Sequence, residues 1–85
     1  MRRHLLLKKI ASGAFHNVDF SDMISLMEGL GFRLTRISGS HHIFSHSAIH
    51  ELVNLQEVGG DAKPYQIRQV LRLVERYDLR LKDGL

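Results

Sequence analysis

The stretch DFSDMISLMEGLGFRLTRISGSHHIF, residues 19–44, contains the change of hydrophobic period that decides the fold. Its first half carries apolar side chains at the three- and four-residue spacing of an amphipathic helix: Phe20, Met23, Ile24, Met27 and Leu30. Asp19 and Asp22 form a pair similar to a capping box at the start of this helix, and Gly31 is a typical helix stop. From Phe32 onward the apolar residues follow a period of two, which predicts a strand.

In this first strand we expect Phe32, Leu34 and the aliphatic part of Arg36 to share one face of a sheet. The pair Gly39-Ser40 then predicts a tight reversal. Two further strands are predicted over residues 42–46 and 51–56, with a short loop between them. Together these segments predict a three-stranded antiparallel meander.

Helical patterns lie on both sides of this meander. A short helix is predicted over residues 3–12, and Gly13 ends it. After a loop at Gly59-Gly60-Asp61, Pro64 occupies the first position of a final helix. The apolar side of that helix is formed by Ile67, Val70, Leu71, Val74 and Tyr77. We expect the tail, residues 80–85, to fray.

The order helix, helix, three strands, helix predicts an α+β fold in which the helices pack on one face of an antiparallel sheet. This is the arrangement of the double-stranded-RNA-binding domain. With 85 residues the chain is expected to form a single two-layer domain over residues 1–85, with its core over residues 20–79. Topology alone does not establish RNA binding, because similar folds carry many functions.

Composition narrows the classes of function. The chain has 44% hydrophobic and 25% charged residues, and no apolar run approaches the roughly 20 residues that span a bilayer. Lys8 and Lys9 interrupt the only apolar stretch near the start, so we expect no secretory signal and a cytoplasmic protein. The sequence has no cysteine, which excludes disulfides, thiolate metal sites and cysteine nucleophiles.

The charge pattern is consistent with a polyanionic partner. The formal net charge is +3, and Arg68, Arg72 and Arg76 recur every four residues along the final helix. Such a stripe of guanidinium groups either contacts phosphate or forms a solvated helix face, and the charge pattern alone does not separate these two interpretations.

Six histidines are the main chemical resource of the chain. The Gly39-Ser40 turn would deliver His41 and His42 to the start of a strand, where adjacent side chains face opposite sides. A metal site built from His41, His42, His46 and His50 is the less favoured interpretation. His42 and His46 share a strand face but lie four residues apart, roughly 13 Å along an extended chain, which is too far for one ion.

The sequence resembles the HicA, or YcfA-like, family of bacterial toxin ribonucleases. The resemblance runs from about Phe20 to Leu79 and rests on an amphipathic helix ending in Gly31-Phe32, then Arg36, then Gly39-Ser40-His41-His42-Ile43-Phe44. It implies a small messenger-RNA endonuclease that a HicB-like antitoxin holds inactive. It also implies that His41, the histidine directly after Gly-Ser, is the catalytic residue.

This chain departs from the family pattern in its third strand and last helix. Many members carry a Val-Pro-x-His segment and a Gly-Thr-Leu helix start, whereas this chain has Leu52-Val53-Asn54-Leu55-Gln56 and a helix that starts at Lys63-Pro64-Tyr65. The chain is therefore expected to form a divergent branch of this family.

Cleavage of RNA needs no metal or cofactor, because the substrate's 2′-hydroxyl can act as the nucleophile. We assign the general base to His41, with His42 as the alternative or as a structural residue. The residues expected to contact RNA phosphates are Arg36, Gly39, Ser40, Lys63, Arg68, Arg72 and Arg76. The alternative function is a non-catalytic RNA-binding module on the same fold.

Overall fold

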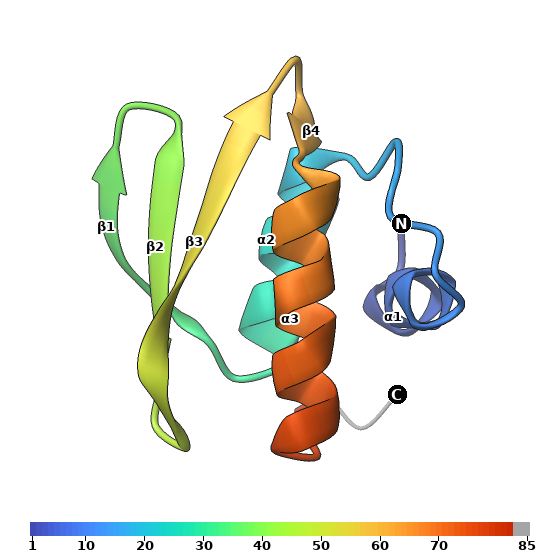
Figure 1. Ribbon diagram of the computed structural model, residues 1–85, viewed down its shortest axis with the longest axis vertical. Coiled ribbons are helices and arrows are strands. Elements are labelled where there is room, and N and C mark those ends of the chain that lie inside the picture. The colour runs from blue at the N-terminus through green and yellow to red at the C-terminus, as the bar shows by residue number, and fades with distance from the viewer. Residues whose placement is uncertain (83–85) are drawn as a thin grey trace.

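A computed structural model describes residues 1–82 and has an α+β architecture (Figure 1). The elements follow the order α1 (Arg3–Ala11), α2 (Phe20–Gly29), β1 (Arg33–Ser38), β2 (His41–His46), β3 (Ile49–Val58), β4 (Asp61–Ala62) and α3 (Pro64–Arg76). The strands form one antiparallel sheet in the order β1-β2-β3-β4. The predicted fold class, an antiparallel sheet with helices on one face, is confirmed. No helix within residues 1–82 is long and apolar enough to span a membrane.

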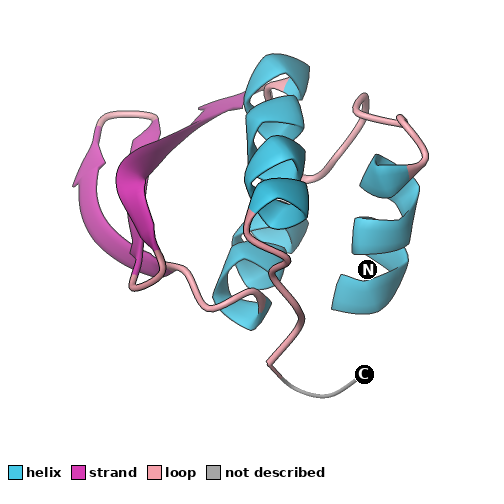
Figure 2. Cartoon of the chain, turned by 60° about the horizontal axis from the view of Figure 1, so that its bottom comes forward, coloured by secondary structure: helices cyan, strands magenta, loops and turns pink. Residues whose placement is uncertain are grey.

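The elements lie in three layers rather than the two that we expected. Helices α2 and α3 cover one face of the sheet, and α1 lies on the far side of these helices, where it contacts both (Figures 1 and 2). The α1 side chains of Leu6 and Ile10 are fully buried there. The other face of the sheet is covered by no element of residues 1–82, and we call it the open face.

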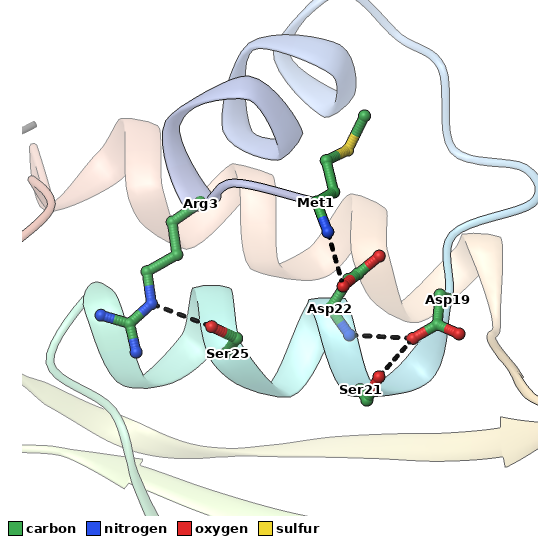
Figure 3. A network of polar contacts seen from close by, with 6 residues as sticks. All are labelled: Met1, Arg3, Asp19, Ser21, Asp22 and Ser25. Carbon is green, nitrogen blue, oxygen red and sulfur yellow. Dashed lines mark hydrogen bonds and ion pairs between the residues drawn. The ribbon is translucent and has the colours of Figure 1, made fainter.

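Helix α2 begins and ends as its sequence predicts. The carboxylate of Asp19 accepts hydrogen bonds from the Asp22 backbone N–H and the Ser21 hydroxyl (Figure 3). At the other end Gly31 adopts φ = +94°, and the N–H groups of Gly31 and Phe32 donate to the carbonyls of Glu28 and Met27. This is the Schellman arrangement, which satisfies the last carbonyls of the helix.

Polar contacts also hold α1 against α2. The amino group of Met1 lies 3.0 Å from an Asp22 carboxylate oxygen, and Arg3 Nε donates to the Ser25 hydroxyl at 3.0 Å (Figure 3). These exposed or half-buried contacts contribute little individually. The buried apolar face of α1 therefore provides most of its attachment.

The core extends from the sheet through α2 and α3 to α1 and is wholly apolar among the described residues. Its largest fully buried side chain is Phe44 of β2, which belongs to the same apolar cluster as residues of α2 and α3. From β3, Val53 and Leu55 are buried at 4% and 0% exposure, on the side that the alternation of the strand turns towards the helices.

The three-stranded meander is extended by a fourth strand where we predicted only a loop. Gly59 and Gly60 adopt φ = +59° and +86°, which makes a two-residue turn and pairs Val58 with Asp61. Two consecutive positive φ angles are typical of the tightest hairpins, and glycine adopts them without strain. The β2–β3 connection is also shorter than predicted, because His46 already pairs with Ile49.

The tail that we expected to fray makes contacts as far as Lys82. The Lys82 N–H donates to the Gly29 carbonyl at 2.7 Å, and the side chain of Leu81 packs against the core. Residues 83–85, the rest of that prediction, lie outside the described residues.

Candidate functional site

The two adjacent histidines face opposite sides of β2. The ring of His42 points towards the helices, where its centroid lies 4.8 Å from that of Phe20 in an edge-on arrangement. The next residue on that side of β2 is the fully buried Phe44. By the same alternation His41 lies on the open face. Only His41 of the two imidazoles therefore lies on the open face.

The ring of His41 is held by the neighbouring strand. Its Nδ1 atom lies 3.2 Å from Oδ1 and 3.1 Å from Nδ2 of Asn54 in β3. Within residues 1–82 the other ring nitrogen, Nε2, has no hydrogen-bond partner. His41 is half-buried, so part of the residue is exposed to solvent while Asn54 anchors its Nδ1 atom.

A tight turn brings the chain to His41. Ser38 pairs with His41, so Gly39 and Ser40 are the two central residues of the β1–β2 hairpin. Gly39 has φ = +60° and Ser40 does not have a positive φ, which is the pattern of a turn with glycine at its first central position. Both residues are exposed, and the Ser40 carbonyl accepts from the Glu57 N–H at 3.0 Å.

A bulge in β1 places Arg36 on the open face. Leu34 pairs with Phe44, which faces the helices, but the register then shifts and Arg36 pairs with Ile43. Ile43 lies two residues after His41, and its side chain is therefore on the same side as His41. Our expectation that Arg36 shares a face with Leu34 was wrong, because the extra residue Thr35 reverses the alternation.

The start of α3 lies beside the edge of β3 next to this site. The Gln66 Oε1 atom accepts from the backbone N–H of Gln56 at 2.6 Å, and Gln56 is the β3 partner of His41. Lys63 occupies the position just before α3 and is exposed. The first turn of α3 and Lys63 thus stand one strand away from the histidine.

Comparison with known proteins gives one match. A family model described as HicA toxin of bacterial toxin-antitoxin matches residues 20–75, well over half of the chain. The chain belongs to the HicA toxin family. No curated protein and no solved structure matches significantly. Membership implies the role of a messenger-RNA interferase with RNase-like activity, an RNA substrate and an antitoxin partner.

The match to the HicA toxin family begins at the first residue of α2 and ends one residue before the end of α3. It therefore includes the whole sheet, the Gly39-Ser40 turn and both histidines. Helix α1 lies outside the matched range, and the third layer of the fold is an addition to the matched part.

The three arginines of α3 have different surroundings. The guanidinium of Arg68 lies over the ring of Phe15, 5.2 Å from its centroid. Arg76 makes an ion pair of 3.8 Å with Glu51, which also accepts a hydrogen bond from the Tyr77 hydroxyl. Arg72 lies between them and has no carboxylate partner within residues 1–82. The stripe is therefore partly neutralised at its Arg76 end.

Two grooves border the arginines of α3. One, of about 260 Å³, lies between α3 and β3 and is lined by Glu51, Arg72 and Arg76 among others. The other, of about 420 Å³, has no acidic residue and is lined by Phe15, His16, Pro64, Tyr65, Arg68, Gln69 and Arg72. Tyr65 is 64% exposed, and its hydroxyl accepts from the Gln69 amide at 3.0 Å.

The structure does not bring the whole stripe to the histidine. Arg76 pairs with Glu51, which lies five residues before Gln56 along β3, about 16 Å in an extended strand. The Lys63 end of α3 is the one near His41. The three arginines that we expect to contact RNA are therefore not equally near the histidine strand, and Arg76 lies at the distant end of α3.

His46, at the other end of β2, is separated from His41. His46 faces the helices, where its Nε2 lies 3.0 Å from the Leu30 carbonyl and its ring is edge-on to Phe32. Within residues 1–82, no three side chains of histidine, aspartate or glutamate come together as ligands of a metal ion would.

Proposed function

We propose that this protein is a metal-independent endoribonuclease that cleaves messenger RNA in the cytoplasm, with His41 as the general base. The observation that carries the proposal is the position of His41 on the open face of the sheet. There, one ring nitrogen is anchored by Asn54 and the other is free of any partner among the described residues. An RNA strand laid across this face would meet that nitrogen.

The reaction would use the substrate's own nucleophile. His41 removes the proton of the 2′-hydroxyl, the resulting alkoxide attacks the adjacent phosphorus, and the bond to the 5′-oxygen breaks with protonation of that oxygen by water. Arg36, exposed on the same face, is suited to stabilise the negative charge that develops on the phosphorane. The products would be a 2′,3′-cyclic phosphate and a 5′-hydroxyl.

His42 is a poorer candidate for the base. Its ring packs edge-on against Phe20, and its Nδ1 atom is buried without a hydrogen-bond partner. A ring in this position faces the core rather than the open face. These contacts support a structural role for His42 and leave the general base to His41.

The proposed path of the RNA continues from His41 towards the first half of α3. Gly39 and Ser40 would approach the phosphates through an exposed turn, and Lys63 and Arg68 would neutralise them. The groove beside Arg72 offers two aromatic rings and two guanidinium groups without an acidic residue, a combination that suits unpaired bases and their phosphates. Arg76 contributes less in this proposal because Glu51 neutralises it.

We further propose that a HicB-like antitoxin inhibits the protein by covering this surface. An antitoxin that presents carboxylates to Lys63 and Arg68 would exclude RNA and shield His41 together. Neither Lys63 nor Arg68 makes an ion pair with a carboxylate among the described residues, and the chain as a whole carries a formal net charge of +3.

The decisive experiment compares the purified wild-type protein with His41→Ala and His42→Ala on a defined single-stranded RNA in EDTA. We expect cleavage by the wild type and by His42→Ala, a loss of about 10²- to 10⁴-fold for His41→Ala, and cyclic-phosphate ends. Circular dichroism checks that each variant is folded. A strict requirement for a divalent ion, or 5′-phosphate ends, would contradict the mechanism. RNA binding without cleavage would favour the non-catalytic module.

A further inference from the structure

Asn54 is the only residue among the described ones whose side chain holds His41 by a hydrogen bond. In the β2–β3 register His41 pairs with Gln56 and Ile43 pairs with Asn54, so Asn54 is the diagonal neighbour of His41 on the open face. Both amide heavy atoms of Asn54 lie within 3.2 Å of His41 Nδ1. The contact joins two strands and is independent of the turn that carries His41.

The position of Asn54 itself is firmly fixed. Its neighbours Val53 and Leu55 are buried in the core, at 4% and 0% exposure. Close-packed side chains on both sides restrain the backbone at Asn54, so its Cα–Cβ bond keeps its place beside His41. The contact with Nδ1 then selects the side-chain rotamer that holds the amide against the ring.

A neutral imidazole has one N–H and one lone pair, and only the nitrogen with the lone pair can act as a base. Free histidine prefers the tautomer with hydrogen on Nε2, which would remove the lone pair from the nitrogen that is accessible here. A hydrogen-bond acceptor at Nδ1 reverses this preference, because it holds the hydrogen at Nδ1. The amide oxygen of Asn54 is within reach to be that acceptor.

We propose that Asn54 is a positioning residue whose amide oxygen accepts a hydrogen bond from His41 Nδ1–H and so keeps the lone pair on Nε2. This inference rests on the proposed function of His41 as general base. Once His41 has taken a proton, both ring nitrogens carry hydrogen, and the amide oxygen still accepts from Nδ1. If the amide were flipped, its NH2 group would face the Nδ1–H of the protonated ring, and two hydrogen-bond donors would oppose each other.

The experiment has one readout that does not depend on cleavage. Nitrogen-15 NMR of the imidazole side chains reports which nitrogen of His41 carries hydrogen in the wild type, in Asn54→Ala and in Gln56→Ala. We expect the Nδ1–H tautomer in the wild type and in Gln56→Ala, and a shift towards Nε2–H in Asn54→Ala. Gln56→Ala is the matched control, since it removes an amide from the strand partner of His41.

The second readout is the rate of RNA cleavage and its dependence on pH. For Asn54→Ala we expect kcat to fall by about ten- to a hundredfold, less than the loss of the base itself, with little change in KM. For Asn54→Asp we expect the hydrogen bond to be kept and the limb of the pH profile due to His41 to move to higher pH, because a nearby carboxylate favours the imidazolium.

The proposal is overturned if the wild type holds His41 in the Nε2–H tautomer, or if Asn54→Ala changes neither the tautomer nor kcat. Failure of the proposed function gives a different result. In that case His41→Ala would cleave as fast as the wild type, while the NMR spectra would still report the Nδ1–H tautomer and its loss in Asn54→Ala.

Discussion

His41 and His42 are neighbours in the chain, and the pleat of β2 gives them opposite surroundings. His41 is accessible and hydrogen-bonded to Asn54, whereas His42 packs against Phe20 with a buried nitrogen that has no partner. A buried polar atom without a partner destabilises the fold by about 1–3 kcal/mol relative to a satisfied one. His42 thus carries a penalty that an apolar ring would avoid.

Replacing His42 by phenylalanine should therefore keep both the fold and the activity. The new ring retains the edge-on contact with Phe20 and removes the unsatisfied nitrogen, so we expect the free energy of unfolding in urea to stay equal or to rise by up to about 1 kcal/mol. RNA cleavage should remain within about threefold of the wild type. A loss of cleavage as large as that of His41→Ala would assign the base to residue 42.

Gly31 is a second residue whose surroundings favour glycine over any other residue. Its φ of +94° strains any side chain, and a Cβ atom there would lie 3.0 Å from His46 Nε2 and 2.8 Å from Lys82 Cε. Gly13 has the same φ of +94°, but a Cβ atom there would meet no atom within 4 Å. The pair therefore separates backbone strain from crowding.

We expect Gly13→Ala to destabilise the protein by about 1–2 kcal/mol through backbone strain alone. Gly31→Ala should destabilise it by more, because the added methyl group also displaces His46 and its contact with the Leu30 carbonyl. Urea unfolding followed by circular dichroism measures both values. Equal losses in the two variants would show that the crowding at Gly31 relaxes freely.

At the scale of elements, the arginines of α3 lie in two different charge environments. Arg68 and Arg72 line an aromatic groove without acidic residues, whereas Arg76 in the last turn is paired with Glu51. Phosphate binding releases counterions in proportion to the number of contacts, so it leaves a signature in the salt dependence of affinity. Arg68 and Arg72 should therefore contribute more than Arg76 to the salt dependence of RNA affinity.

We predict that Arg68→Gln with Arg72→Gln weakens RNA binding and lowers the slope of log affinity against log salt by about 1–2, without a change in base preference. Arg76→Gln, the control on the same helix, should change both quantities much less. Binding is measured at two salt concentrations on the inactive His41→Ala background. If the affinity and the slope of the double variant are those of its parent, the stripe is a solvated helix face.

Helix α2 provides a prediction about acid stability. The hydrogen bonds from the Ser21 hydroxyl and the Asp22 backbone N–H lower the pKa of the Asp19 carboxyl below its ordinary value of 3.8. Because the pKa is lower in the folded state, the stabilisation is present above pH 3.8 and is lost as the pH falls through the folded value. The group is exposed, so the effect is modest.

Asp19→Asn keeps a good N-cap but cannot titrate. We therefore expect the thermal midpoint of the wild type to exceed that of Asp19→Asn near pH 7, and the difference to shrink as the pH is lowered below about 4. Thermal melts over this range provide the measurement. A difference that is independent of pH would mean that the carboxylate charge does not stabilise the cap.

At the scale of the whole molecule, the fold depends on one core that side chains from all three layers build. Phe44 is central to it, being fully buried on the strand that carries His41. For a domain of 85 residues the total stability is expected to be about 4–13 kcal/mol. A single large cavity would therefore remove a substantial fraction of it.

Phe44→Ala should destabilise the protein by about 3–5 kcal/mol and lower its urea midpoint accordingly. Leu52→Ala, eight residues along the meander and 66% exposed, is the control and should change stability by less than about 0.5 kcal/mol. Urea unfolding tests both. A loss below about 1 kcal/mol for Phe44→Ala would mean that the core repacks around the cavity.

Much of the fold could be read from local signals in the sequence. The helical spacing from Phe20 to Leu30, the stop at Gly31 and the Pro64 start correctly predicted α2 and α3, because capping and amphipathic periodicity act over neighbouring residues. The alternation along the strands and the Gly39-Ser40 turn predicted the first hairpin. The motif around His41 also indicated the family that the comparison then identified.

Tertiary structure decided what depends on register and on contacts between distant segments. The bulge at Thr35 moved Arg36 to the open face, and no local pattern marked it. Two glycines with positive φ gave β4 where we predicted only a loop. The contact of Asn54 with His41 needed the alignment of β2 and β3, and Glu51 neutralised one end of the arginine stripe from another element.

The sequence by itself determined which residues can carry the chemistry, because side-chain type and local periodicity are properties of neighbouring residues. Only the packed sheet decided which of them share a face.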